Sequence, residues 1–139
     1  MVCIYCDGNT CVANSRPQKK INQIWRRRQC LDCGNNFTTH EFAELGSLIT
    51  VRYSSRQLKP FSRDQLFLSI YESCRHRAQT ISDSTALTQT IISQLYSHVS
   101  SEGVLERDSI ATVAHTVLER FDNTAATVYA AYHLATKTA

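Results

Sequence analysis

The sequence predicts an α+β fold in two parts, a small β-rich N-terminal part and a C-terminal part with a β-hairpin and about four helices. Two observations predict this division. Two Cys-x-x-Cys pairs lie within residues 1–33, whereas apolar residues recur at helical spacing only from about residue 62 onward. Gly46 and Ser47 indicate a domain boundary, so we expect domains at 1–47 and 48–139.

The composition indicates a folded protein of the cytoplasm. Hydrophobic residues make up 42% of the chain, which allows a modest core. No apolar run approaches the ~18 residues of a membrane span. The first residues, MVCIYCDGN, lack the basic start and apolar stretch of a signal peptide. Because cysteines stay reduced in the cytoplasm, the 6 cysteines point to metal binding, burial or chemistry rather than to disulfides.

The four N-terminal cysteines form the clearest motif. Cys3 and Cys6 make one Cys-x-x-Cys pair, Cys30 and Cys33 make the other, and a glycine closely follows each pair. A tight knuckle often needs positive φ at that point, which glycine adopts easily. Two knuckles offer four thiolates, the tetrahedral set that Zn²⁺ prefers, so we predict one structural Zn²⁺ per chain. The alternative, a redox Cys-x-x-Cys, normally precedes a helix in a βαβ unit, and neither pair does.

The sequence does not indicate an enzyme. Use of all four thiolates leaves no open coordination position for a catalytic water. The chain has no Gly-x-x-x-x-Gly-Lys loop, no Gly-x-Gly-x-x-Gly and no convincing catalytic triad.

Two cysteines and the histidine His40 remain outside the two pairs. Cys74 falls on the apolar stripe of a predicted helix and is expected in the core. Cys11 could compete for the metal, but it lacks a paired cysteine. His40 is a conceivable spare ligand, although an ordinary strand histidine is the simpler interpretation.

A basic stretch leads into the second knuckle. Between Asn14 and Cys30 the chain has no Asp or Glu, and its basic residues there are Arg16, Lys19, Lys20, Arg26, Arg27 and Arg28. Such a stretch suits phosphates, and arginine can also reach guanine edges. We predict that these residues contact double-stranded DNA. A solvated basic surface is the alternative.

Two strands are expected around the second knuckle. QIWRRRQ reads as the strand that enters it, and NNFTTHEF as the strand that leaves it. Alternation would place Arg26 and Arg28 on one face of the sheet and Arg27 on the other. The residues expected to form a small core here are Ile24, Trp25 and Phe37. Stacking of Trp25 on a DNA base is the alternative for that residue.

The C-terminal part begins with a predicted hairpin. LITVRY reads as a β-branched strand, SSRQ as a turn and LKPF as a short return strand closed by Pro60. Ser62 and Gln65 then form a Ser-x-x-Gln capping box for the first helix.

Four helices are predicted from apolar residues at helical spacing. Their core positions are Leu66, Phe67, Ile70, Tyr71 and Cys74; Leu87, Ile91, Ile92, Leu95, Tyr96 and Val99; Ile110, Val113, Ala114, Val117, Leu118 and Phe121; and Ala125, Val128, Tyr129, Tyr132 and Leu134. The third helix is expected to start near Asp108 or Ser109, and the fourth to be capped by Asp122 or Asn123.

Basic residues gather on the hairpin and the start of the first helix. They are Arg52, Arg56, Lys59 and Arg63, and together with Val51 they form the predicted nucleotide-binding set. Basic groups at such positions could hold a nucleotide's phosphates. The alternative is a solvated basic edge.

The motifs CIYC, NSR, RRRQCLDC and FTTHE, in this order, resemble the NrdR family, the bacterial repressors of ribonucleotide reductase genes. The resemblance covers nearly the full length. It implies an N-terminal zinc ribbon that binds DNA and a C-terminal ATP-cone that senses ATP and dATP. Residues that match the family's zinc ligands are Cys3, Cys6, Cys30 and Cys33, and those that match its basic DNA-binding positions are Arg16, Arg26, Arg27 and Arg28.

The C-terminal half departs from the family pattern. Lys59 stands where glutamate is common and Gln65 where lysine is usual, while Ala126 and Val128 replace a tyrosine and an arginine. We expect a zinc-dependent, nucleotide-responsive repressor that forms homo-oligomers, binds ribonucleotide reductase promoters, and binds ATP and dATP with similar affinity. The alternative is a nucleotide-independent DNA-binding protein whose degenerate ATP-cone serves only oligomerisation.

Overall fold

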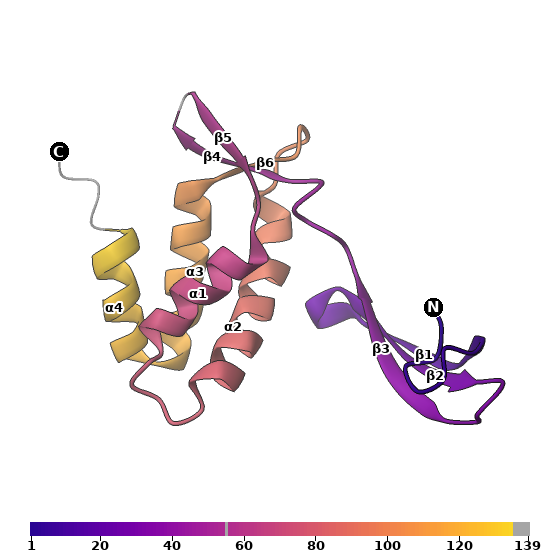
Figure 1. The fold of residues 1–139 in the computed structure, drawn as a ribbon. Coiled ribbons are helices and arrows are strands. Elements are labelled where there is room, and N and C mark those ends of the chain that lie inside the picture. Colours follow the sequence, from indigo (N-terminus) through magenta and orange to yellow (C-terminus); the bar gives the residue numbers. More distant parts are fainter. Residues whose placement is uncertain (55, 135–139) are drawn as a thin grey trace. The chain divides into compact units, whose positions relative to one another are not determined.

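The computed structural model describes residues 1–54 and 56–134, which form two compact units (Figure 1). The first unit is Met1–Ala43 and the second begins at Glu44. The sequence placed this division four residues later, after Ser47. Residues from Glu44 onward join the second unit because Leu45 packs against its core, and the Leu45 carbonyl accepts hydrogen bonds from the backbone N–H groups of Leu48 and Ile49.

The first unit is a three-stranded antiparallel sheet in the order β1-β2-β3. Its strands are β1 (Thr10–Gln18), β2 (Gln23–Cys30) and β3 (Asn36–Phe42), and the 3₁₀ turn η1 (Lys19–Ile21) joins the first two. The strands predicted on both sides of the second knuckle are confirmed. A bulge at Ala13 shifts the pairing of β1 with β2, so Val12 lies opposite Arg28 and Asn14 lies opposite Arg27.

The second unit combines a small sheet with four helices. The sheet contains β4 (Thr50–Ser54), β5 (Gln57–Pro60) and β6 (Val104–Glu106), in the order β5-β4-β6. The helices are α1 (Arg63–Ser73), α2 (Thr80–Leu95), α3 (Arg107–Phe121) and α4 (Asn123–His133), and the 3₁₀ turn η2 (Tyr96–His98) follows α2. The predicted α+β class is confirmed, because strands and helices both occur in the predicted order.

The predicted hairpin is present, with two differences. Its first strand begins at Thr50 rather than Leu48, which lies in a turn, and the predicted turn residue Ser55 lies outside the described residues. The structure also adds β6, which pairs with β4 in parallel. A strand of three residues is too short to show a periodic pattern in the sequence.

The core of the second unit lies among its helices and under β4 and β6. α1 packs against α2 and α4, and α3 packs against the same two helices. The fully buried side chains include Ile70, Ile91, Leu105 and Leu118. Cys74 belongs to this core, as the sequence predicted. Burial of these apolar stripes stabilises each helix more than its intrinsic propensity does.

The predicted helix caps are present. Ser62 Oγ accepts a hydrogen bond from Gln65 N (3.2 Å), which caps α1. Asp122 Oδ1 accepts from Thr124 N (2.9 Å) and Ala125 N (3.1 Å), which caps α4. Among the described residues, no helix is long and apolar enough to cross a membrane.

Candidate functional site

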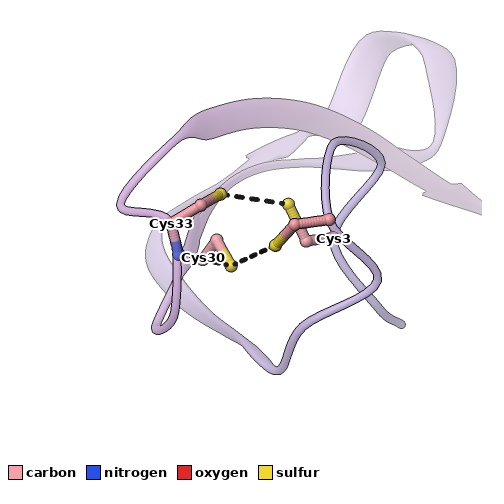
Figure 2. A group of neighbouring side chains, drawn as sticks. Cys3, Cys30 and Cys33 are labelled. Atoms are coloured by element: carbon pink, nitrogen blue, oxygen red, sulfur yellow. Dashed lines mark hydrogen bonds between the residues drawn. The ribbon is translucent and has the colours of Figure 1, made fainter.

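The four predicted metal ligands lie together at one end of the first unit. The Sγ atoms of Cys3, Cys6, Cys30 and Cys33 all lie within 4.8 Å of one another. The Cys3–Cys33 and Cys6–Cys30 separations are 3.7 and 3.5 Å, and Figure 2 shows Cys3, Cys30 and Cys33 facing a common centre. Zn–S bonds of about 2.3 Å in a tetrahedron would separate the sulfurs by about 3.8 Å. The donor set and its spacing therefore fit a zinc ion.

The two other candidate ligands lie outside this cluster. Cys11 is exposed on β1, opposite Gln29. His40 is on β3, where its Nδ1 lies 3.1 Å from Gln23 Nε2. Neither residue belongs to the cysteine group. The structure therefore supports the interpretation of His40 as an ordinary strand histidine.

Backbone N–H groups of the knuckles point at the sulfurs. Tyr5 N donates to Cys3 Sγ, and Asp32 N and Cys33 N both donate to Cys30 Sγ, each at 3.4 Å. The Cys33 N–H is the main reason that the pKa of Cys30 falls to about 7. The thiolate is the form that binds metal, so this arrangement prepares Cys30 as a ligand.

The pKa of Cys6 shifts in the opposite direction. The backbone N–H of Gly8 lowers it, but the neighbouring sulfurs of Cys33 and Cys30 raise it to about 12. Four thiols at this spacing cannot all lose their protons unless a cation neutralises the charge. This electrostatic requirement is a second reason to assign a metal to the cluster.

The two knuckles use glycine differently. Gly34 follows Cys33 directly and has φ +74°, as predicted, whereas in the first knuckle Asp7 takes the positive φ of 58°. Gly8 leaves room for the carboxylate of Asp32, which a Cβ at this position would displace. That carboxylate accepts a hydrogen bond from Asn9 N (3.1 Å) and so ties the second knuckle to the first. Sequence reasoning missed this role of Asp32.

One face of the sheet carries exposed polar and aromatic side chains. Opposed residues in an antiparallel pair share a face, so Arg16, Trp25 and His40 form one row across the sheet. Asn14, Arg27 and Thr38 form the next row. We call this surface the open face; its residues are Asn14, Arg16, Trp25, Arg27, Thr38 and His40. The Arg16 guanidinium lies 6.0 Å from the Trp25 ring centre, at the outer limit of a cation–π contact.

The opposite face carries the two other arginines of β2, as alternation predicted. Arg26 Nη2 pairs with Glu41 Oε2 at 2.9 Å, and Arg28 Nη1 lies 3.5 Å from Thr10 Oγ1. Both arginines are half-buried, whereas Arg27 is exposed. Arg27 forms no ion pair with the described residues. The lysines Lys19 and Lys20 are exposed in η1, next to the sheet.

Of the expected ribbon core, Phe37 is buried, whereas Ile24 and Trp25 are only half-buried and lie outside the buried cluster. The buried cluster consists of Cys3, Cys30 and Phe37. Phe37 lies opposite Arg28, while Trp25 lies opposite His40, so the two aromatic rings are on different faces of the sheet. Trp25 is therefore half-buried on the open face. A single position of register decides this outcome.

The second unit contains a cavity of about 290 Å³. Its walls come from β4, α1, α3 and α4 and from the residues just before α1. The lining residues are Val51, Tyr53, Phe61, Ser62, Gln65, Leu66, Ser69, Arg107, Ile110, Ala111, Tyr129 and His133. Of the predicted nucleotide-binding residues, Val51 alone belongs to this lining.

The four predicted phosphate-binding side chains lie elsewhere. Arg52 Nε pairs with Glu106 Oε1 (3.1 Å), and Lys59 Nζ lies 5.6 Å from the ring centre of Tyr53. Arg56 lies in the hairpin turn and Arg63 at the start of α1, and both are exposed. Lys59 therefore lies beside Tyr53, which lines the cavity.

Sequence reasoning missed three polar residues of the cavity: Arg107, Tyr129 and His133. Tyr129 was assigned to a core stripe, and its side chain is indeed buried, which raises its pKa to about 12. The His133 ring stacks on it at 4.3 Å between ring centres. Burial, and then the charge of Arg107, lower the pKa of His133. No pattern of sequence spacing connects α3 with the last turn of α4. The proximity of these three residues could therefore not be predicted from the sequence.

Comparison with known proteins identifies relatives of both units. The family described as "Transcriptional repressor NrdR-like, N-terminal domain" matches residues 1–41. Proteins named "Transcriptional repressor NrdR" match further. One from Sphingopyxis alaskensis is 33% identical over 126 residues, 90% of this chain and 79% of the relative. One from Methylobacterium sp. (strain 4-46) is 41% identical over 111 residues, 76% of this chain and 59% of the relative.

A third relative matches a shorter stretch. The protein of the same name from Symbiobacterium thermophilum is 40% identical over 77 residues, 55% of this chain and 51% of the relative. With several of these relatives, the match thus spans only about half to three-fifths of the relative's length.

Proposed function

The chain belongs to the NrdR family of transcriptional repressors, and we propose that it is a zinc-dependent, nucleotide-responsive repressor of ribonucleotide reductase genes. The observation that carries this proposal is the open face. A basic, aromatic-bearing sheet surface stands next to a four-cysteine cluster that can fix it in place. We infer that it acts on promoter DNA in the cytoplasm as a homo-oligomer.

The zinc has a structural role in this proposal. Cys3, Cys6, Cys30 and Cys33 would hold it, and all four thiolates are used. The buried core of the first unit comprises three side chains, too few to stabilise a fold of this size alone. A structural zinc can contribute on the order of 10 kcal/mol. Bound zinc therefore fixes both knuckles and, through Cys30, the end of the arginine strand β2.

In this proposal the six basic residues between Asn14 and Cys30 form the DNA-binding element, and the four that lie on the open face or in η1 contact the DNA directly. Arg16 and Arg27 reach out from the open face, and Lys19 and Lys20 extend the positive surface at η1. Arginine can pair bidentately with phosphate or with a guanine edge. Trp25 lies between the basic side chains of its face and offers a flat apolar surface to the sugar-phosphate backbone or a base. Arg26 and Arg28 hold the strand from the other face.

The cavity of the second unit is the nucleotide site in this proposal. Apolar walls suit a base, and the polar groups at Gln65, Ser69 and Arg107 suit a ribose and phosphates. Lys59 can add a second cation from beside Tyr53. Nucleotide occupancy would then bias which oligomer forms, and so which tandem DNA sites the ribbons can reach together.

Titration of the full chain with ATP and with dATP tests the nucleotide part. Heat is measured by calorimetry and assembly by light scattering. We expect both nucleotides to bind with similar affinity and to change the average mass. A preference for dATP beyond about tenfold, or 1.4 kcal/mol, would contradict the assignment of discrimination to the positions now held by Lys59, Gln65, Ala126 and Val128.

A second function is favoured by one observation, the position of Arg52, Arg56 and Arg63 outside the cavity. In that case the chain binds DNA without nucleotide control, and the second unit serves only oligomerisation. Absence of heat and of mass change with either nucleotide at millimolar concentration would establish this alternative. Expression from a ribonucleotide reductase promoter reporter, with and without the chain, tests repression in both cases.

A further inference from the structure

The cavity of the second unit has an unusual balance of charge for a site that would receive phosphates. Its described lining contains one permanent cation, Arg107, and no carboxylate. One further lining group, His133, can become a cation near neutral pH. A nucleotide triphosphate would bring several negative charges into this space, more than Arg107 alone can balance.

His133 is held where it can respond to such a ligand. It sits in the last turn of α4, half-buried, with its ring stacked on Tyr129 at 4.3 Å between centres and 29° between planes. The titratable and charged groups that face this corner are Arg107 from α3, Tyr129 from α4 and Tyr53 from β4, with Lys59 of β5 beyond Tyr53. None of them is a carboxyl group.

This environment disfavours the protonated imidazole as long as no anionic ligand lies beside it. Burial and the Arg107 charge lower the pKa of His133 below its ordinary value. Phosphate groups beside Arg107 would reverse the balance, because a nearby negative charge favours the protonated ring. Ligand binding and proton binding at this residue are therefore thermodynamically linked.

We propose that His133 determines which ligands this cavity accepts, by taking up a proton when a phosphorylated nucleotide binds. This inference rests on the proposed nucleotide response of the second unit. If His133 takes up this proton, phosphorylated ligands bind more tightly as the pH falls. The change occurs between the pKa of His133 in the ligand-bound chain and its pKa in the free chain. A neutral nucleoside, which brings no charge, binds without this dependence.

Calorimetry on the full chain tests the proposal with ATP and adenosine as probes, at pH 6, 7 and 8. Measurement in buffers of different ionisation enthalpy gives the number of protons taken up. The variant His133→Gln keeps a polar side chain that cannot titrate, and His98→Gln, at an exposed position outside the cavity, is the matched control. ATP also titrates in this range, so the comparison between wild type and His133→Gln removes its contribution.

We expect the affinity for ATP to fall from pH 6 to pH 8 in wild type and in His98→Gln. This fold-loss should be at least about three times the fold-loss seen in His133→Gln. Adenosine should show no such difference. Equal pH dependence and equal proton uptake in wild type and His133→Gln would overturn this inference while leaving the nucleotide response intact. Absence of ATP binding at every pH would overturn both proposals.

A second measurement covers the case in which His133→Gln does not fold. The NMR signal of the His133 Cε1–H group in the native chain is followed against pH, with and without ATP. The inference requires the pKa to be higher with ATP than without it. An unchanged or lower pKa would overturn it.

Discussion

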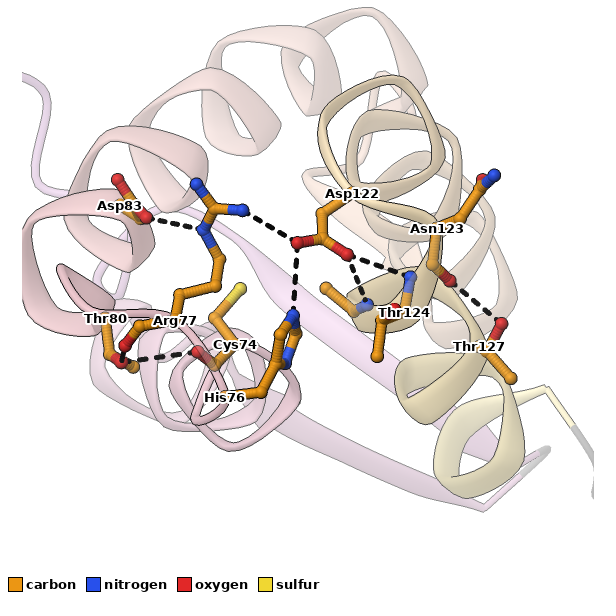
Figure 3. A network of polar contacts seen from close by, with 10 residues as sticks. Cys74, His76, Arg77, Thr80, Asp83, Asp122, Asn123, Thr124 and Thr127 are labelled. Atoms are coloured by element: carbon orange, nitrogen blue, oxygen red, sulfur yellow. Dashed lines mark hydrogen bonds and ion pairs between the residues drawn. The ribbon is translucent and has the colours of Figure 1, made fainter.

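Among single residues, Asp122 connects the start of α4 to the segment between α1 and α2. Its Oδ2 accepts from Arg77 Nη1 (2.7 Å) and lies 3.1 Å from His76 Nε2, while its Oδ1 caps α4 (Figure 3). Arg77 also pairs with Asp83 Oδ2 (2.7 Å) and lies over the ring of Phe121. The sequence predicted the cap at Asp122. It could not predict the pairing with Arg77, because no local pattern joins residues so far apart in the chain.

Asp122 should make the stability of the folded chain depend on pH in the acid range. His76, and then Arg77, hold the pKa of its carboxyl well below the ordinary value. The carboxylate therefore adds stability at pH values above the unfolded pKa of about 4, and this contribution is lost as the pH falls toward the folded pKa. Asp122→Asn keeps a capping side chain but no charge. Thermal melts should show that wild type is more stable at pH 7 and that the difference shrinks by pH 2.

The cap itself is tested by Asp122→Ala. This change removes the acceptor for two backbone N–H groups of α4 and both ion-pair contacts. We expect the melting temperature at pH 7 to fall by about 5 °C or more. A melting temperature for Asp122→Ala equal to that of Asp122→Asn would show that capping contributes nothing here.

At the scale of elements, the periodic patterns predicted the strands beside the second knuckle and the four helices, because burial of one face requires those periods. The patterns could not predict which face of the ribbon sheet is open. That depends on the bulge at Ala13 and on the register that sets Trp25 opposite His40, and alternation along one strand specifies neither. Likewise, the cavity residues Arg107 and His133 come from helices whose pairing is tertiary.

Helix α2 contains a polar residue where the pattern required an apolar one. Thr88 is fully buried, and its Oγ1 has no hydrogen-bond partner among the described residues. Replacing it with the isosteric valine removes an unsatisfied hydroxyl, so we expect Thr88→Val to stabilise the chain by about 1 kcal/mol. The control Thr85→Val loses an exposed hydroxyl that bonds Ile81 O (2.8 Å) and should not stabilise. Denaturant unfolding of both variants checks this; destabilisation by Thr88→Val would contradict it.

The two faces of β2 allow a matched test of DNA binding. Arg26 and Arg27 are neighbours, but Arg26 is paired with Glu41 while Arg27 stands on the open face. Arg27→Ala should weaken promoter binding about tenfold and reduce the salt dependence by about one counterion, whereas Arg26→Ala should have a smaller effect on both. Anisotropy titrations over a range of salt give both quantities. A larger loss for Arg26→Ala would assign the DNA to the opposite face.

At the scale of the whole molecule, the two units have separate cores and different sources of stability. The second unit buries an extended apolar core among its helices, whereas we propose that the first unit depends on a bound metal. Cys30→Ser should therefore unfold the first unit, seen as loss of NMR dispersion for β1 to β3, and reduce bound zinc far below one per chain. The thermal transition of the second unit should persist. An ordered ribbon without metal would refute the structural role of zinc.

We propose that the zinc-bound ribbon recognises ribonucleotide reductase promoter DNA through its open face. The most direct test is fluorescence anisotropy of the full, zinc-loaded chain on a duplex from such a promoter and on a scrambled duplex of equal length, at one physiological salt concentration. We expect the chain to bind the promoter duplex at least about 100-fold more tightly than the scrambled duplex. This preference should be lost when the zinc is removed. Equal affinity for the two duplexes, or promoter binding that survives metal removal, would contradict it.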